Sequence, residues 1–176
     1  MMFKKNPAGA FVLFLLSVAV IDQLSKFYIL RLNALDPGAL LSGIPIIIGF
    51  LEITLTYNQG IIFGFLGNAN NLVILTLNIF ILAGVFIFVA MDIKRGRTGL
   101  LYLGGFGLIL GGALGNILDR IIVGKVIDFI KVYITSDFIW PIFNIADSAI
   151  TVGIILVFAD MIFFDRESKI NAPDTA

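Results

Sequence analysis

Long apolar stretches alternate along this chain with shorter polar connections. Four of the stretches each hold close to the roughly 20 residues that a helix needs to cross a bilayer. They lie at about residues 9–30, 70–91, 99–119 and 141–163. The first continues past Asp22 and Lys26 without a small-residue cleavage site, so we expect a retained helix rather than a secretory signal. The pattern predicts an all-α integral membrane protein with four transmembrane helices.

The connection between the first two stretches follows a different period. In LEITLTYN, residues 51–58, polar and apolar side chains alternate with a period of two, which is typical of a half-buried strand. We therefore expect short strands over about 45–65, forming a small interfacial β-strand subdomain at the membrane surface. The later connection at 120–140 mixes β-branched and aromatic residues, with Tyr133 and Trp140 as expected interfacial anchors.

The composition supports a membrane protein and narrows its chemistry. Hydrophobic residues make up 59% of the chain, charged residues 14%, and the mean hydropathy is +1.04, outside the range of soluble domains. The chain has no cysteine and no histidine, which excludes disulfides, thiol nucleophiles and His or Cys metal sites. Its 12 basic and 12 acidic residues include no long basic run, so we expect no nucleic-acid partner. Any catalysis must use carboxylates, Lys, Ser, Thr or Tyr, and we expect neither metal nor cofactor.

The positions of the basic residues predict the orientation in the membrane. Basic residues gather at the N-terminus, between the second and third spans, and after the fourth span. They are Lys4, Lys5, Lys94, Arg95, Arg97, Arg166 and Lys169. Because cytoplasmic segments carry an excess of Lys and Arg, both termini and the middle loop are expected in the cytoplasm. The connections at about 31–69 and 120–140 then face the opposite, outward side.

Polar side chains interrupt the spans, and we expect them to gather at the outward ends of the helices. Asp22 and Lys26 are four residues apart on one helix face, in the favourable order for an ion pair. Asn116 and Arg120 are also four residues apart. A charged side chain inside a bilayer costs several kcal/mol, so such residues usually have a function. The alternative is that Asp22 and Lys26 only neutralise each other and tolerate burial.

Two aspartates form the candidate catalytic pair. Asp147 lies three residues after Asn144 near the outward end of the fourth span, and Asp128 follows the third span in the apolar setting VIDFI. Two close carboxylates cannot easily both ionise, so one keeps its proton. Such a pair offers a general acid and a general base in one site. The alternative is an interfacial Asp128 that is unconnected to a helix-packing Asp147.

Two classes of non-enzyme compete with this interpretation. Asp22, Lys26, Arg120 and Asp147 could form the ion relay of a small proton-coupled transporter. The uncharged stretch at 70–91 and the gathering of polar residues on one side argue against transport. A scaffold held together by the glycines of the third span is the other class, but it leaves the two aspartates of the candidate pair unexplained.

Five short motifs carry a resemblance to a known family. They are DQLSK at 22–26, YNQGIIFGF at 57–65, GNILDR at 115–120, VIDF at 126–129 and FNIADSAI at 143–150. With these motifs in this order, nearly the whole chain resembles the lipoprotein signal peptidases, also called signal peptidase II. On this likeness Asp128 and Asp147 fall at the positions of the family's catalytic aspartates. The positions that line or support the site are Asp22, Lys26, Asn58, Gly60, Asn116, Arg120 and Asn144.

The resemblance implies an aspartic endopeptidase of the bacterial inner membrane. Residues 1–170 would form one membrane-embedded protease domain, and 171–176 a disordered tail. Such enzymes remove the signal peptide of a prolipoprotein on the N-terminal side of a diacylglyceryl-modified cysteine. The expected partners are therefore lipidated prolipoproteins and membrane lipid, with cyclic peptides as inhibitors. The site is expected at the outward interface. From their composition, the strands at 45–65 and the loop at 126–140 are expected to cradle the lipid and gate the site.

The same resemblance suggests roles for the polar residues around the pair. The two aspartates would hold the attacking water. Asn58, Asn116 and Asn144 would orient the carboxylates or the substrate backbone. Arg120 would either bind a substrate carbonyl or hold Asp119.

Overall fold

The computed structural model describes residues 6–59 and 71–163 of the chain. Its helices are α2 (Pro7–Leu35), α3 (Pro37–Ser42), α4 (Asn71–Lys94), α5 (Leu100–Ile122) and α6 (Ile145–Phe163). Its strands are β1 (Ile44–Ile47), β2 (Leu51–Asn58) and β3 (Val126–Val132). Within the described ranges, four helices are long and apolar enough to cross a membrane, namely α2, α4, α5 and α6. The predicted fold class is confirmed, while the predicted tail at 171–176 lies outside the described residues.

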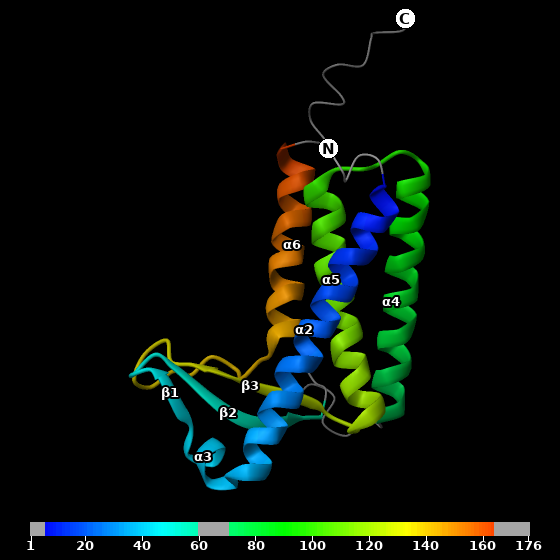
Figure 1. The fold of residues 1–176 in the computed structure, drawn as a ribbon. Helices are drawn as coiled ribbons and strands as arrows, with labels where there is room; N and C mark the ends of the chain where they lie inside the picture. Colours follow the sequence, from blue (N-terminus) through cyan, green and yellow to red (C-terminus); the bar gives the residue numbers. More distant parts are fainter. Residues whose placement is uncertain (1–5, 60–70, 164–176) are drawn as a thin grey trace, which may run out of the picture.

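Helix α5 is the central element of the bundle, with α2, α4 and α6 around it (Figure 1). In the most apolar 18-residue segment of α5, 56% of the residues are buried, whereas in that of α4 only 11% are. Glycines allow the close packing of α5: a Cβ at Gly111 would lie 2.5 Å from the carbonyl oxygen of Leu15 on α2. A Cβ at Gly153 of α6 would lie 2.5 Å from the carbonyl oxygen of Gly105. Larger side chains at these positions would push the helices apart.

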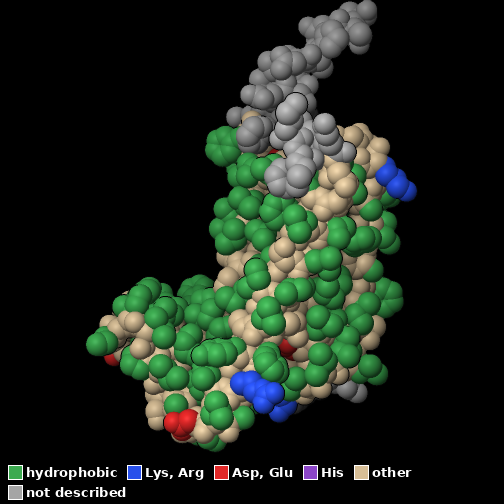
Figure 2. Space-filling model, in the orientation of Figure 1, with side chains coloured by type: hydrophobic (Ala, Val, Ile, Leu, Met, Phe, Trp, Pro, Cys, Tyr) green, Lys and Arg blue, Asp and Glu red, His purple; other side chains and the backbone are tan. Residues whose placement is uncertain are grey.

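The outer surface of the bundle is apolar. Hydrophobic side chains cover most of the face of the bundle seen in Figure 2, and the Lys and Arg side chains visible there lie toward its two ends. Large hydrophobic side chains on α4 are well exposed, among them Phe80 and Ile87. A surface of this kind is suited to lipid rather than water.

The first helix is longer than the sequence pattern predicts. It begins after Asn6, whose Oδ1 accepts a hydrogen bond from the Gly9 amide at 2.8 Å, and it ends at Leu35. Its 29 residues span roughly 43 Å at 1.5 Å per residue, more than a bilayer core of about 30 Å. Asp36 then caps the short helix α3 through the amides of Gly38 and Ala39. The end of α2 can therefore reach beyond the hydrocarbon.

A three-stranded antiparallel sheet, in the order β1-β2-β3, projects sideways from one end of the bundle (Figure 1). The expected strand region is confirmed over 44–47 and 51–58, whereas residues 60–65 lie outside the described residues. The third strand, β3, was not predicted, because its run VIDFIKV shows no clean alternation and becomes a strand by pairing with β2. That pairing sets Asp128 opposite Thr56. We call this end of the bundle the sheet end and the other the opposite end.

The expectation that the polar residues of the spans gather at one end misses a second buried group at the other end. At the opposite end, Asp92 of α4 and Asp160 of α6 are buried, and Arg97 Nη2 lies 3.1 Å from Asp160 Oδ2. The Tyr102 hydroxyl of α5 donates to Asp92 Oδ2 at 2.7 Å. Helix α4 continues past the predicted stretch to Lys94 and so includes Asp92. We call Asp92, Arg97, Tyr102 and Asp160 the opposite-end cluster.

Candidate active site

The start of α6 positions one of the two aspartates. The Asn144 side-chain oxygen accepts a hydrogen bond from the Asp147 amide at 2.9 Å, and Asp147 Oδ2 accepts one from the Asn144 amide at 3.3 Å. This reciprocal arrangement is a capping box, which satisfies amides that the first turn of a helix leaves unpaired. It explains why α6 begins at Ile145 rather than at the predicted residue 141. The cap also fixes the Asp147 carboxylate against the helix start.

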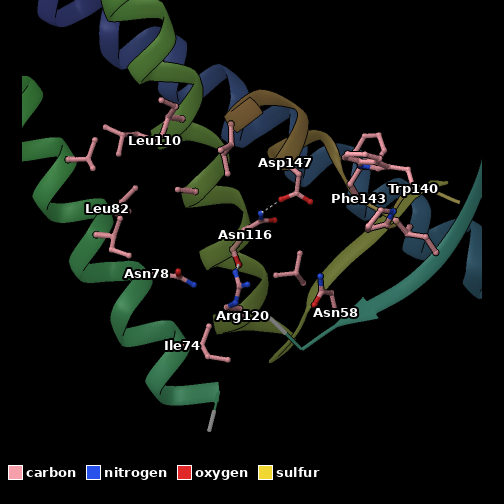
Figure 3. A pocket seen from close by; sticks show the side chains of 18 residues that line it. Asn58, Ile74, Asn78, Leu82, Leu110, Asn116, Arg120, Trp140, Phe143 and Asp147 are labelled. Atoms are coloured by element: carbon pink, nitrogen blue, oxygen red, sulfur yellow. Dashed lines mark hydrogen bonds between the residues drawn. The ribbon is translucent and has the colours of Figure 1, made fainter. Parts of the chain in front are cut away.

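Strand β3 positions the second aspartate, and Asn144 joins the two. Asn144 Nδ2 donates to Asp128 Oδ1 at 2.7 Å, while Asn58 Nδ2 at the end of β2 donates to Asp128 Oδ2 at 3.0 Å. Asn116 Nδ2 on α5 donates to Asp147 Oδ1 at 2.8 Å (Figure 3). Asn144 is fully buried and bonded to both aspartates. The structure thus brings together two carboxylates that are 19 residues apart.

The surroundings of Asp128 favour its protonated form. Its side chain is only 2% exposed, and burial raises its pKa to about 6. The hydrogen bond from Asn58 opposes this rise, and the charge of Asp147 adds to it. The two carboxylates therefore interact electrostatically, as a pair that shares a site does.

Behind the pair lies a buried charge cluster on α2 and α5. Lys26 Nζ lies 2.7 Å from Asp22 Oδ2 and 2.7 Å from Asp119 Oδ2, and it donates to Asn116 Oδ1 at 3.1 Å. The predicted Asp22–Lys26 ion pair is confirmed. The backbone amide of Ala146 donates to Asp22 Oδ1 at 3.0 Å, which ties this cluster to α6. These buried charges are paired and hydrogen-bonded, as low-dielectric surroundings require.

Sequence reasoning missed one member of this cluster, Gln23. Its Nε2 donates to Asp119 Oδ1 at 2.8 Å and to the Gly115 carbonyl at 3.1 Å. Gln23 lies inside the motif DQLSK, but its partners are 92 and 96 residues away along the chain. Asp119 also accepts a hydrogen bond from the Ile127 amide at 3.0 Å, so it links α5 to β3.

A cavity of about 680 Å³ opens beside Asp147, between α4, α5 and the start of α6 (Figure 3). Its polar lining residues are Asn58, Asn78, Asn116, Arg120 and Asp147. The remaining lining is apolar and includes Trp140 and Phe143. Asp128 does not line the cavity itself, but its partner Asn58 does. A pocket with an apolar lining and a few polar groups is the usual form of a binding site.

Arg120 faces this cavity with part of its guanidinium unpaired. Its Nη1 donates to the Asn116 carbonyl at 3.1 Å, whereas its Nε is buried without a hydrogen-bond partner in the described part of the chain. Asp119 is bonded instead to Lys26, Gln23 and the Ile127 amide. Of the two roles expected for Arg120, the geometry therefore favours binding of a group that enters the cavity.

Except for Gly60, the predicted site residues converge at the sheet end. Gly60 lies outside the described residues. Among residues 6–59 and 71–163, no group of three or more acidic side chains is arranged to hold a metal ion. The arrangement can therefore act on a substrate through two carboxylates, three asparagine amides and one guanidinium.

Comparisons with known proteins agree with this arrangement. The sequence profile of the family Signal peptidase (SPase) II matches residues 14–163. The lipoprotein signal peptidase of Syntrophus aciditrophicus is 39% identical over 168 residues, covering 94% of this chain and 99% of that protein. That of Geobacillus thermodenitrificans is 40% identical over 165 residues, covering 92% and 96%.

Solved structures show the same fold. One bacterial membrane enzyme solved by the in meso method has a TM-score of 0.71 and 30% identity, covering 96% of this chain and 94% of that chain. A second has a TM-score of 0.70 and 32% identity, covering 89% and 94%. The chain therefore belongs to the signal peptidase II family, the bacterial integral membrane peptidases that remove signal peptides from prolipoproteins.

Proposed function

We propose that this protein is an aspartic endopeptidase in which Asp128 and Asp147 form the catalytic pair. It cuts prolipoproteins on the N-terminal side of a cysteine that carries a diacylglyceryl group. The observation that carries the proposal is that Asn144 donates to both carboxylates, with its side-chain amide to Asp128 and its backbone amide to Asp147, beside a cavity that Asp147 lines. Two carboxylates held together in this way share one proton and supply both an acid and a base.

The proposed reaction needs no covalent intermediate. The ionised carboxylate removes a proton from a water molecule, whose oxygen bonds to the carbonyl carbon of the scissile peptide. The other carboxylate donates its proton to the carbonyl oxygen. When the carbon–nitrogen bond breaks, the departing amine takes the proton that the first carboxylate removed from water. The second carboxylate takes a hydroxyl proton from the tetrahedral intermediate as the product carboxyl group forms, and the pair regains its starting state. Asn58 donates to Asp128 Oδ2, and the second lone pair of that oxygen can accept a hydrogen bond from the water.

The surrounding residues then have supporting roles. Lys26 and Asn144 both donate to Asn116 Oδ1, so the Asn116 amide group is turned with its Nδ2 toward Asp147. The guanidinium of Arg120, which lines the cavity and whose Nε has no partner in the described part of the chain, suits a substrate carbonyl. Asp22 holds Lys26 in place.

The membrane setting of the proposal follows from the fold. We place residues 1–170 in one membrane-embedded domain with both termini in the cytoplasm, and the sheet end at the outward interface. The sheet and the following loop carry exposed apolar side chains such as Ile48 and Trp140. These would hold the diacylglyceryl group and adjacent membrane lipid, and the cavity would accept cyclic peptide inhibitors.

The proposal is tested by cleavage of a diacylglyceryl-modified prolipoprotein and of its unlipidated form by purified protein in detergent. Wild type should cut only the lipidated substrate. Asp128→Asn and Asp147→Asn should each lose activity by at least about 10³-fold while their unfolding temperatures show that they stay folded. Asp137→Asn, which changes an exposed carboxylate in the loop after β3, is the matched control and should keep full activity. Cleavage by Asp147→Asn at the wild-type rate would rule out the pair.

A further inference from the structure

One polar side chain of the cavity belongs to neither the aspartate pair nor the buried charge cluster. Asn78 lies on α4 among the apolar cavity residues Ile74, Ile81 and Leu82. In the described part of the chain, no hydrogen-bond partner is found for its side-chain amide. Thr76 on the same helix differs, because its hydroxyl donates to the Leu72 carbonyl at 2.7 Å and is satisfied within the helix.

An amide at this position needs a partner. Transfer of an unpaired amide from water into apolar surroundings costs a few kcal/mol, and no lipid tail can offset this cost. Asn78 reaches from α4 into the cavity toward Arg120 on α5 (Figure 3). Arg120 in turn has a buried Nε without a partner among the described residues. Two walls of one cavity therefore present polar groups whose hydrogen bonds are left for a bound molecule.

The chemistry of the substrate requires such partners. A signal peptide satisfies its own backbone groups while it crosses the membrane as a helix, but cleavage needs an accessible carbonyl and so an unwound segment. Each backbone N–H or C=O group released by unwinding costs several kcal/mol at membrane depth unless the enzyme replaces its partner. An asparagine side chain offers one carbonyl and one NH₂ group, which match the N–H and C=O groups of a single backbone residue.

The geometry points to Asn78 as a substrate-positioning residue. We propose that Asn78 and Arg120 together hold the unwound backbone of the substrate on the signal-peptide side of the scissile bond. This inference rests on the proposed function. The cavity runs from Asp147 along α4 and α5 as far as Val85 and Leu110, which gives the signal-peptide segment an apolar path away from the aspartates. Asn78 would set where along this segment the helix gives way to extended backbone.

Steady-state cleavage of a diacylglyceryl lipopeptide by full-length protein in detergent tests this proposal. Asn78→Leu, of similar size but without hydrogen bonds, should raise KM about tenfold without lowering the unfolding temperature, because the unpaired amide costs stability in the substrate-free protein. Asn78→Ala serves as the second variant in case leucine overfills the cavity. Thr76→Val is the matched control on the same helix and should stay within about twofold of wild type.

A backbone-modified substrate separates direct contact from a structural effect. In a series of lipopeptides, each amide preceding the scissile bond is replaced in turn by an ester, which removes one N–H donor. One ester should raise the KM of wild type about tenfold. The same ester should not raise the KM of Asn78→Leu further, because both changes remove the same hydrogen bond. A KM of Asn78→Leu within twofold of the wild-type value would overturn the proposal. So would an ester series in which every ester raises KM by the same factor in Asn78→Leu as in wild type. If the proposed catalytic pair is wrong, Asp147→Asn will still cleave the substrate. The KM values of wild type and Asn78→Leu can be compared in either case.

Discussion

The two ends of the helical bundle contain similar residues but differ in how their polar groups are satisfied. In the opposite-end cluster Arg97 lies 3.1 Å from Asp160 and 4.0 Å from Asp92, and its guanidinium stacks 4.1 Å above the Tyr102 ring. That cluster joins three helices, and its residues do not line the large cavity. At the sheet end, Asp147, Asn78 and Arg120 face that cavity.

This difference shows that buried charge alone does not mark a site. Both ends contain buried aspartates with a basic partner, and by sequence alone Asp160 resembles Asp147. What distinguishes the sheet end is that polar side chains line a cavity, including Arg120, whose Nε has no partner among the described residues. Breaking contacts at each end should therefore affect different properties of the enzyme.

The largest effect is expected for Lys26→Met. This change leaves the Asp22 and Asp119 carboxylates buried without their cation, which should lower the free energy of unfolding by about 3–5 kcal/mol. Activity should fall with it, because Asn116 loses the donor that helps to orient its amide toward Asp147. Denaturant unfolding in detergent measures the first effect and lipopeptide cleavage the second. Lys94→Met, at an exposed lysine, is the control. If Lys26→Met lost no more stability than Lys94→Met, the role of Lys26 in the buried charge cluster would be contradicted.

Asn144→Ser should separate helix capping from support of the aspartates. Serine is also a good N-cap residue, so α6 should still begin at Ile145. The donor to Asp128 is lost, however, and cleavage should slow by about 10²-fold. Circular dichroism and initial rates on the lipopeptide check the two parts. Ser148→Ala, one turn later, is the control and should cleave near the wild-type rate. If Asn144→Ser also cleaved at the wild-type rate, Asn144 would serve only as the helix cap.

Arg97→Met tests the opposite-end cluster. Removal of the guanidinium leaves Asp92 and Asp160 with fewer partners and should cost roughly 1–3 kcal/mol of stability. Since this cluster lies at the other end of the bundle, kcat/KM at a temperature where the protein is folded should stay within about twofold of wild type. Thermal unfolding and cleavage of the same preparation give both values. A large loss of kcat/KM without unfolding would mean that the two ends are coupled.

The smallest expected effect is a shift in the pH profile. With its pKa raised to about 6, Asp128 holds a proton below that pH and loses it above, so the shared proton is lost and kcat/KM should fall as the pH rises through about 6. The Asn58 hydrogen bond favours the ionised form, so Asn58→Leu should move this limb to higher pH by up to about one unit. A pH series of kcat/KM measures the shift, which belongs to the pair rather than to one residue. A limb that moves to lower pH would contradict the assignment.

The sequence predicted the parts of this protein that depend on local spacing. Apolar runs of about 20 residues gave the four membrane helices, because a helix in lipid must satisfy its own backbone and cover the hydrocarbon. The spacing of four between Asp22 and Lys26 gave their ion pair, because side chains at that spacing share a helix face. The alternation in residues 51–58 predicted β2, because successive side chains of a strand point to opposite faces of the sheet.

Tertiary structure decided the contacts between elements. Strand β3 exists through its pairing with β2, and Asn144 meets Asp128 because that strand passes the start of α6. Likewise, the side chains that pack around the cavity decide that the Asn78 amide and the Arg120 Nε have no partner among the described residues. The period of a helix or strand fixes only the direction of a side chain relative to its near neighbours. Whether that side chain finds a partner depends on how separate elements pack. In this bundle the glycines of α5 bring the helices close together and so determine which side chains meet.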